Sequence, residues 1–512
     1  MEYWIRGAGR DTLVWSGAYM KIDDLRSALQ LLELTPGQLL RTDAEVDANA
    51  ELAGVYRRVG AGTPVEPPTR IGPAMLFQNV KGHPGVRIVT GVMASRKRVG
   101  LLLDCAPEDL GDRLLEAYES RIAPAPYASG TPPCQQVIHR APLDIRKLLP
   151  APTNTPLDAG PYFTMGLLRA TDPETGEHDV TIHRLCVQSE DTISIFFAPG
   201  RHIDVFRQKA EAMGRSLPVS ISMGLDPAVY ISACFEAPTT PQGFDELSVA
   251  GGLRGEPVRL ATCVSISETA IANAEVVMEG EIIPGVRVRE DQNSNTGHAM
   301  PEFPGYNGAA NPSLALMRVT AITHRSNPIL QTIVGPGEEH VNLAGIPTEA
   351  SIKRMVDDAM PGRLQRVYAH SAGGGKLLAI LQFKKSVPSD EGRQRQAALI
   401  ALAVYSELKH VILVDEDVDI FDSNEVLWAM TTRYQGNMST IFIPGVIGHV
   451  LDPSQSPSFS ASLPREGTTC KTIFDCTVPF ALKERFARAK FQEIAEADLQ
   501  RFLAPSTQPL LL

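Results

Sequence analysis

HDVTIHRLCVQ (178–188) is the clearest of several short apolar segments between residues 160 and 335. Each segment is rich in β-branched residues and is bounded by turn residues, which is the pattern of a β-strand. The others are TISIFFAP (192–199), LPVSISMG (217–224), VRLATCVSI (258–266) and AEVVMEGEII (274–283). A single helical segment, IDVFRQKAEAMG (203–214), interrupts them, with Gly214 as its expected C-cap. Many short strands and one helix predict a barrel-like sheet in the centre of the chain.

The sequence before this region alternates between helical and strand patterns. Residues 22–34 have helical spacing, whereas GPAMLFQNVKG (72–82) and VRIVTGVMAS (86–95) predict strands joined by a glycine turn. A proline-rich passage between residues 124 and 156 predicts the crossover into the central region.

The sequence after the central region also alternates between helix and strand. Helices are predicted for residues 348–360 and 391–408, and strands for residues 376–385 and 410–421. The tail, residues 478–503, is amphipathic and predicts a terminal helix that packs either on its own domain or across a partner subunit. The chain is therefore predicted to have an α/β (α+β) fold in three parts, residues 1–125, 126–335 and 336–512.

Composition narrows the class of protein. The 512 residues are 43% hydrophobic with a net charge of -11, which allows large cores and argues against nucleic-acid binding. No apolar run approaches the ~20 residues of a membrane-spanning helix, and MEYWIRGAGRDT (1–12) does not resemble a signal peptide. The seven cysteines are scattered, without a close pair, which indicates reduced thiols. A soluble, cytoplasmic protein is expected.

Arg184 is the first candidate functional residue. On a strand it shares a face with Val180 and Ile182, and an arginine on an apolar face needs an anionic partner. A structural ion pair would meet that need, and so would the planar carboxylate of a substrate, which a guanidinium binds through two hydrogen bonds.

Three further residues have the chemistry of metal ligands. Asp179, His202 and Glu246 together offer oxygen and nitrogen donors suited to Mn²⁺ or Mg²⁺, with a phosphate filling other positions. Each also has an ordinary explanation, because a histidine at a helix start is often a cap or a surface residue. Likewise, a glutamate in the first turn of a short helix is common.

Glu302 is a candidate proton donor. It lies in HAMPEFPGYNG (298–308) between two prolines, with Phe303 and Tyr306 as apolar neighbours. A partly desolvated glutamate has a raised pKa and can act as a general acid near neutral pH, although a solvated loop glutamate fits the sequence equally well.

The order and spacing of these residues resemble the UbiD family of reversible decarboxylases. The resemblance runs from roughly residue 40 to 480. It includes GPAMLFQNVKG (72–82), DPETG (172–176), FAPGRHI (197–203), EFPGY (302–306), THRSNPILQTIVGPGEEH (323–340) and ILVDEDVDIFD (412–422).

The resemblance implies a UbiD-like architecture with prenylated FMN as cofactor. It implies an N-terminal α/β portion, a central split β-barrel that binds the flavin, and a C-terminal α/β oligomerisation domain with a terminal helix. A divalent metal (Mn²⁺ or Mg²⁺) and K⁺ would tie the flavin phosphate to the protein. Expected partners are a flavin prenyltransferase that supplies the cofactor and a second copy of the chain, as a homodimer or hexamer.

Site residues also follow from the resemblance. Asp179, His202 and Glu246 fall on the metal ligands, Arg184 on the arginine of a Glu-Arg-Glu set, and Glu302 on the acid that exchanges the proton. The cofactor is expected to be lined by Thr181, Ile182, His183, Arg184 and Arg201.

One position departs from the family pattern. The second glutamate of the set usually stands five positions before the proton donor, which here is Gly297. We therefore expect His298 to take over part of its role, with Asn295 and His298 setting substrate specificity. This form of the loop is similar to the branch that acts on five-membered ring acids such as pyrrole-2-carboxylate or furan dicarboxylate.

The predicted function is reversible, non-oxidative decarboxylation of an aromatic or heteroaromatic acid, with release of CO₂. Prenylated FMN would serve as electron sink, Arg184 would orient the carboxylate and Glu302 would protonate the product carbon. Three alternatives are the same chemistry on a phenolic or acrylic acid, a non-catalytic flavin-binding oligomeric protein, and a metal-dependent hydrolase.

Overall fold

The computed structural model describes residues 20–62, 66, 68–197, 201–236, 239–455, 459, 467–495, 498 and 502. The segment MEYWIRGAGRDT (1–12) and residues 198–200 of FAPGRHI lie outside the described residues. Among the helices described, none is long and apolar enough to cross a membrane. All seven cysteines are free thiols.

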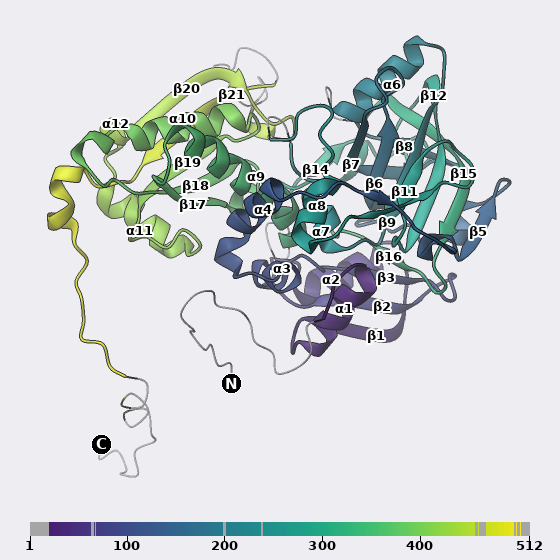
Figure 1. Cartoon of the computed structure of the whole chain (residues 1–512), viewed down its shortest axis with the longest axis horizontal. Helices are drawn as coiled ribbons and strands as arrows, with labels where there is room; N and C mark the ends of the chain where they lie inside the picture. The colour runs from purple at the N-terminus through teal and green to yellow at the C-terminus, as the bar shows by residue number, and fades with distance from the viewer. Residues whose placement is uncertain are drawn as a thin grey trace.

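The N-terminal part is a four-stranded sheet covered by helices (Figure 1). Its strands, in spatial order, are β1 (Leu39–Val46), β2 (Ala74–Val80), β3 (Arg87–Thr90) and β16 (Ile329–Gln331). Its helices are α1 (Leu25–Leu34), α2 (Glu51–Gly60), α3 (Arg96–Leu103) and α4 (Leu110–Glu119). The first helix begins at Leu25, not at residue 22 as its spacing predicts, because the Asp24 side chain caps it by accepting a hydrogen bond from the Ser27 backbone N–H.

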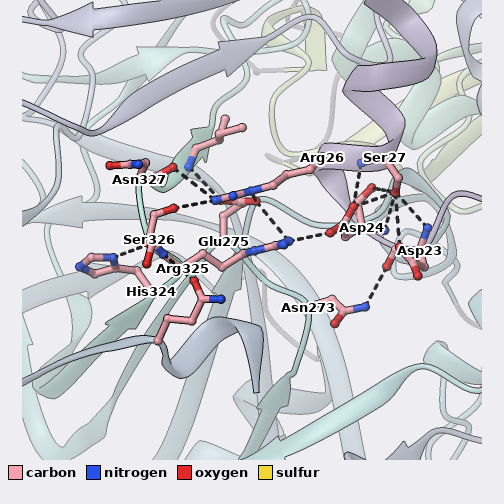
Figure 2. Close-up of polar contacts among 12 residues, drawn as sticks. Asp23, Asp24, Arg26, Ser27, Asn273, Glu275, His324, Arg325, Ser326 and Asn327 are labelled. Carbon is pink, nitrogen blue, oxygen red and sulfur yellow. Dashed lines mark hydrogen bonds and ion pairs between the residues drawn. The ribbon is translucent and has the colours of Figure 1, made fainter. Parts of the chain in front are cut away.

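A buried ion-pair cluster ties α1 to the central part (Figure 2). Glu275, fully buried before strand β12, accepts two hydrogen bonds from the Arg26 guanidinium, at 2.6 and 2.8 Å. Arg325 lies 3.5 Å from the same carboxylate and also donates to Asp24 at 2.6 Å. Two arginines surround a single buried carboxylate, so the cluster fixes how the N-terminal part sits on the barrel.

The central part is a closed six-stranded β-barrel, as predicted. Its strands, in spatial order, are β12 (Val276–Val288), β9 (Leu217–Met223), β6 (Tyr162–Thr171), β7 (His178–Val187), β8 (Thr192–Ile195) and β15 (Leu314–His324). Pairing of β12 with β15 closes the barrel, and β5 (Val137–Arg140) extends the sheet at β15. Leu168, Ile221 and Met278 belong to its apolar core.

One predicted barrel strand lies elsewhere. Residues 258–266 supply β10 (Arg259–Thr262), which pairs with β11 (Thr269–Ile271) and β4 (Ala125–Pro126) in a separate three-stranded sheet. A short connection folds β10 back onto β11 as a hairpin, so this segment never reaches the barrel.

Short helices and a hairpin surround the barrel. The helices are α5 (Ile145–Leu148), α6 (His202–Ala212), α7 (Pro227–Ser232) and α8 (Leu247–Arg254). The hairpin consists of β13 (His298–Pro301) and β14 (Asn307–Ala309). The helix predicted over residues 203–214 is confirmed as α6, and Gly214 after it has φ +66°, as a helix-terminating glycine should.

The C-terminal part is a five-stranded sheet with helices on both faces (Figure 1). Its strands, in spatial order, are β17 (Leu364–Ala369), β18 (Leu378–Phe383), β19 (His410–Asp415), β21 (Thr468–Asp475) and β20 (Thr440–Ile447). Its helices are α9 (Glu338–Ala359), α10 (Arg393–Val404), α11 (Ser423–Arg433) and α12 (Gly436–Ser439). Leu413 packs in one buried cluster and its neighbour Ile412 in another, which shows that both faces of the sheet are covered.

Over residues 480–495 the tail differs from its prediction, whereas residues 496, 497, 499–501 and 503 of the predicted helix lie outside the described residues. A 3₁₀ helix spans Phe480–Phe486, and residues 487–495 have no regular structure as they lead away from the domain (Figure 1). Arg488 anchors the start of this stretch by pairing with Glu425 at 2.6 Å and stacking on Trp428. Phe491 is 91% exposed, so its side chain, which the predicted helix would bury, has little packing support within the described part of the chain.

Candidate active site

Arg184 lies in the last third of β7, with a side chain that is 13% exposed. Its Nε donates to Oε1 of Glu290 at 2.9 Å and its Nη2 to Oε2 at 3.0 Å, which makes a bidentate ion pair. Its third nitrogen, Nη1, donates to Oε1 of Glu302. The guanidinium therefore lies between two carboxylates, in the order glutamate, arginine, glutamate.

Glu290 corrects the expectation that the second glutamate of this set is absent. It follows directly after β12, twelve positions before Glu302 rather than five, and it is almost completely buried. Tyr162 donates its hydroxyl to Oε1 at 3.0 Å, and the backbone N–H of Asn311 donates to Oε2 at 3.0 Å. The expected place beside Arg184 is thus occupied by a carboxylate, not by His298.

Glu290 was missed in the sequence because we searched for the second glutamate at a fixed interval before Glu302. Twelve positions separate the two acids in this chain, so counting back five positions from Glu302 gives Gly297 rather than Glu290. The predicted strand ended at residue 283, so the only local signal was the acidic pair in VRED (288–291), which the structure places just after the end of β12.

Glu302 lies in the turn of the β13–β14 hairpin, with 13% of its side chain exposed. Burial raises its pKa above 4.5, and the Glu290 charge adds to this, although the Arg184 charge acts in the opposite direction. A Cβ on Gly308 would lie 2.8 Å from Cγ of Glu302, so the facing strand needs a glycine there. These surroundings suit a carboxyl group that carries a proton near neutral pH.

An aromatic ring and the two carboxylates together hold the charge and orientation of Arg184. The Phe196 ring lies 4.2 Å from the Arg184 guanidinium carbon, a stacking contact that suits a delocalised cation. Burial alone would lower the pKa of Arg184, but the charges of Glu302 and Glu290 raise it above its ordinary value. Arg184 is therefore a permanent positive charge held in a fixed orientation.

The three predicted metal ligands are only partly brought together. His202, at the start of α6, lies with Nδ1 2.9 Å from Oδ1 of Asp179 on β7. Glu246, before α8, is buried, and its Oε2 has no hydrogen-bond partner. Burial and the nearby Asp179 charge raise the pKa of Glu246 well above 4.5.

No group of three His, Cys, Asp or Glu side chains in the described part of the chain is arranged to hold a metal ion. However, an unpartnered buried carboxylate oxygen close to a second carboxylate is a place where a cation relieves both desolvation and repulsion. The donor chemistry of Asp179, His202 and Glu246 therefore fits a hard divalent cation, whereas their present arrangement pairs two of them with each other.

The residues expected to line the cofactor fall on β7 and at the start of α6. Thr181 and Ile182 are half-buried, and His183 is buried with its ring edge-on to Phe197 at 4.8 Å. Burial, together with the charge of Arg201, lowers the pKa of His183 to about 3, so this imidazole is neutral. Its Nε2 has no partner, which leaves a buried polar atom available to a ligand.

The two specificity candidates lie in the segment between Glu290 and Glu302. Asn295 is exposed, with φ +55°, and accepts a hydrogen bond from the Arg289 side chain. His298 begins β13 and is half-buried, four residues before Glu302.

Comparison with known proteins assigns the family. Three models of 3-octaprenyl-4-hydroxybenzoate carboxy-lyase match consecutive regions: the N-terminal domain over residues 31–118, the Rift-related domain over 126–338 and the C-terminal domain over 341–476.

Individual relatives include gallate decarboxylase of Lactiplantibacillus plantarum, 49% identical over 92% of this chain and 98% of that protein. The apo structure of a 3,4-dihydroxybenzoic acid decarboxylase from Enterobacter cloacae is 61% identical, covers 94% of this chain and 100% of that one, and superposes with a TM-score of 0.90.

The UbiD-class enzyme HmfF from Pelotomaculum thermopropionicum, solved with FMN, is 33% identical over 91% of this chain and 97% of its own, with a TM-score of 0.81. An evolved dimeric form of HmfF is solved with prenylated FMN (prFMN). The family models, these relatives and the barrel with its Glu-Arg-Glu set agree, and the chain belongs to the UbiD family of carboxy-lyases.

Proposed function

We propose that this carboxy-lyase decarboxylates a hydroxylated benzoic acid with prenylated FMN as cofactor. The observation that carries the proposal is the buried set Glu290–Arg184–Glu302. It combines a permanent cation, which can hold a carboxylate, with an acid whose pKa is raised.

Relatives support the phenolic substrate class. The names of two of them specify gallate and 3,4-dihydroxybenzoic acid, both benzoic acids that carry hydroxyl groups. The predicted five-membered ring acid gains no such support, and the phenolic alternative is favoured instead.

Arg184 and Glu302 have separate tasks in the reaction. A substrate carboxylate would compete with Glu302 for Nη1 of Arg184 and be oriented by it. The C–C bond to the carboxyl carbon then breaks, CO₂ leaves, and the proton of Glu302 goes to the ring carbon that has lost it. The balance is one carboxylate and one proton consumed, and one arene and one CO₂ formed.

The electrostatics favour this order of events. With both glutamates ionised, the set carries one net negative charge, and a substrate carboxylate would make it two. Uptake of a proton by Glu302 removes that repulsion and loads the acid when substrate binds. The raised pKa of Glu302 is consistent with this role.

The residues present fit the cofactor. Prenylated FMN, when bound, supplies the electron sink that no side chain offers for a carbanion. Thr181, Ile182, His183 and Arg201 would contact it, and the unpartnered Nε2 of His183 is a free hydrogen-bonding atom.

Asp179, His202 and Glu246 would hold Mn²⁺ or Mg²⁺ against the flavin phosphate, with K⁺ nearby. The unpartnered Oε2 of Glu246 supports this part of the proposal. Binding of the metal would replace the present contact between His202 and Asp179.

Several wider expectations are also part of the proposal. They are the three-part division at about residues 125 and 335, a flavin prenyltransferase as cofactor supplier, and a homodimer or hexamer. Asn295 and His298 would act on substrate choice through the loop that precedes Glu302.

The test uses protein co-expressed with a flavin prenyltransferase. Gallate, 3,4-dihydroxybenzoate, cinnamate, pyrrole-2-carboxylate and furan dicarboxylate are assayed for CO₂ release. Turnover of the hydroxylated benzoates is expected. Activity confined to the five-membered ring acids or to cinnamate would overturn the substrate class, and activity without bound flavin would overturn the cofactor and point to a metal-dependent hydrolase.

A further inference from the structure

A group of four charged side chains crosses from the central part to the C-terminal part of the chain. Arg201 and Glu236 come from the loops before α6 and after α7, whereas Lys376 and Glu407 come from the loops before β18 and after α10. None of these residues belongs to the Glu-Arg-Glu set. We call this group the interdomain cluster.

Arg201 is the member that reaches the cofactor region. It is the N-cap residue of α6, so its backbone leads directly into His202. Its Nη2 lies 2.8 Å from Oε1 of Glu236 and 3.7 Å from Oε1 of Glu407. One carboxylate thus comes from the same part of the chain as Arg201, and the other from the C-terminal part.

Lys376 is the second cation of the interdomain cluster and lies between the same two carboxylates as Arg201. Its Nζ lies 2.7 Å from Oε2 of Glu407 and 3.6 Å from Oε1 of Glu236, and its side chain is 13% exposed. Tyr405 also donates its hydroxyl to Oε2 of Glu407 at 3.2 Å. Each cation of the cluster therefore contacts both carboxylates, and the net charge is zero.

Glu407 is held more firmly than Glu236. Burial would raise its pKa, but the charges of Lys376, His449 and Arg201 lower it well below 4.5, so it is ionised. His449 approaches the same carboxylate with Nε2 at 3.5 Å, and its ring lies edge-on to Phe303 at 4.7 Å. Because Phe303 follows Glu302, Glu407 stands between the start of α6 and the hairpin that carries the proton donor.

Burying such a cluster costs desolvation free energy, and two domains can dock without burying any charge. Desolvation of a buried ion pair usually cancels most of the attraction, so an apolar contact would join the two parts equally well. What a charged cluster adds is orientation, because the carboxylates fix where the Arg201 guanidinium points.

We propose that Glu407 of the C-terminal part is a positioning residue for the flavin site, which acts by holding Arg201 at the start of α6. The inference rests on the proposed role of Arg201 in binding the flavin. It makes the flavin site dependent on a side chain from outside the flavin-binding part of the chain.

A double-mutant cycle with FMN as the probe tests this. Dissociation constants for FMN are measured by flavin fluorescence, with Mn²⁺ present, for the full-length protein and for Glu407→Gln, Arg201→Gln and the double variant. We expect about tenfold weaker binding for Glu407→Gln, which is within the range of coupling between residues of one ion-pair network. We also expect the double variant to bind no more weakly than Arg201→Gln alone.

Additive losses in the double variant would show that Glu407 does not act through Arg201, and wild-type affinity in Glu407→Gln would equally overturn the inference. If Glu407→Gln does not fold, Glu407→Asp keeps the charge on a shorter side chain. Its smaller loss should also vanish in the Arg201→Gln background, and a loss that persists there would overturn the inference.

Asp109→Asn is the matched control. It removes another ion pair to the C-terminal part, Arg366 to Asp109 at 2.9 Å, which involves no member of the interdomain cluster. FMN affinity should be unchanged in Asp109→Asn. If this variant lost as much affinity as Glu407→Gln, the effect would come from weaker docking of the two parts in general, and the inference would be overturned. Failure of the wild-type protein to bind FMN would instead overturn the proposed function, so the two failures are distinct.

Discussion

Glu290 holds Arg184 through two parallel hydrogen bonds although 106 positions separate the two residues. The contact joins the end of one barrel strand to the face of another. Because Glu290 is also fixed by Tyr162 and by the Asn311 backbone, it orients the guanidinium before any ligand arrives.

Replacement of Glu290 by Gln should therefore impair catalysis more than folding. Gln keeps one acceptor but loses the charge and the bidentate pairing, so we expect kcat/KM to fall about 10²-fold or more. Steady-state kinetics on 3,4-dihydroxybenzoate, with flavin content measured by absorbance, checks this. Glu281→Gln, on the exposed side of the same strand, should be indistinguishable from wild type. Wild-type kinetics in the Glu290 variant would contradict the role.

Glu302→Gln should abolish turnover while the cofactor stays bound, because the amide cannot deliver the proton. Exchange of the ring proton of catechol with D₂O, followed by NMR, isolates this step from loss of CO₂. We expect exchange at least 10³-fold slower in the variant, which is the scale of a lost general acid. Normal exchange would remove Glu302 from the proton transfer.

Replacement of Glu246 should show whether this residue binds the proposed metal ion. With the proposed metal site in place, removal of divalent ions with EDTA should weaken FMN binding to the wild-type protein about tenfold or more, because the phosphate would lose its link to Asp179, His202 and Glu246. In Glu246→Gln the affinity should already be low and should barely respond to Mn²⁺. Equal response to Mn²⁺ in both proteins would place the metal elsewhere.

Glu339 should make the free energy of unfolding depend on pH. Burial raises the pKa of this carboxyl to about 7, despite hydrogen bonds from the backbone N–H groups of Met93 and Gly91, which lower it. The folded protein thus binds the proton more tightly than the unfolded chain. The protonated Glu339 therefore contributes to the free energy of unfolding. This contribution is fully present below about pH 4.5 and is lost as pH rises through 7, a total fall of about 3 kcal/mol.

Urea unfolding at pH 5 to 8 measures this effect. The free energy of unfolding of the wild type should fall with pH more steeply than that of Glu339→Gln, whose side chain stays neutral. Parallel curves for the two proteins would contradict the prediction.

Glu275→Gln should be among the most destabilising single changes at the surface of contact between the N-terminal part and the barrel. It leaves Arg26 and Arg325 around an uncharged, buried amide, which costs about 3 kcal/mol when one partner of a buried pair is lost. Glu256→Gln, which breaks the exposed pair with Lys21, should cost less than about 1 kcal/mol. Thermal unfolding of both variants compares the two.

The fold could be predicted from the sequence wherever the spacing of apolar residues fitted only a helix or only a strand. Four barrel strands (β7, β8, β9 and β12), α6 and the alternating layers of the C-terminal part were visible because burial on one or both faces leaves a regular apolar pattern. The other two barrel strands, β6 and β15, were not predicted. The β10 segment has the same composition as a barrel strand, and only its hairpin partner β11 reveals that it belongs to another sheet. Over residues 480–495 the tail prediction was wrong because an amphipathic pattern shows which face needs burial but not which surface buries it.

The site was predictable to a similar degree. Local surroundings made Arg184 and Glu302 candidates and the family resemblance gave them roles, and their direct contact confirms that the two residues lie together. Glu290 could not be found by spacing, and the interdomain cluster draws on four loops whose proximity only the folded chain reveals. Contacts between distant segments leave no periodic trace in a single sequence.

The extended loop between Glu290 and Glu302 also bears on how such proteins are recognised. One carboxylate is attached to the rigid end of a barrel strand and the other to a separate hairpin, so residues can be inserted between them without moving either from Arg184. A search pattern that demands a constant interval between the two acids would discard this chain as catalytically defective. Pattern definitions anchored on each strand end, with a free gap, would retain it and other members whose loops have grown or shrunk.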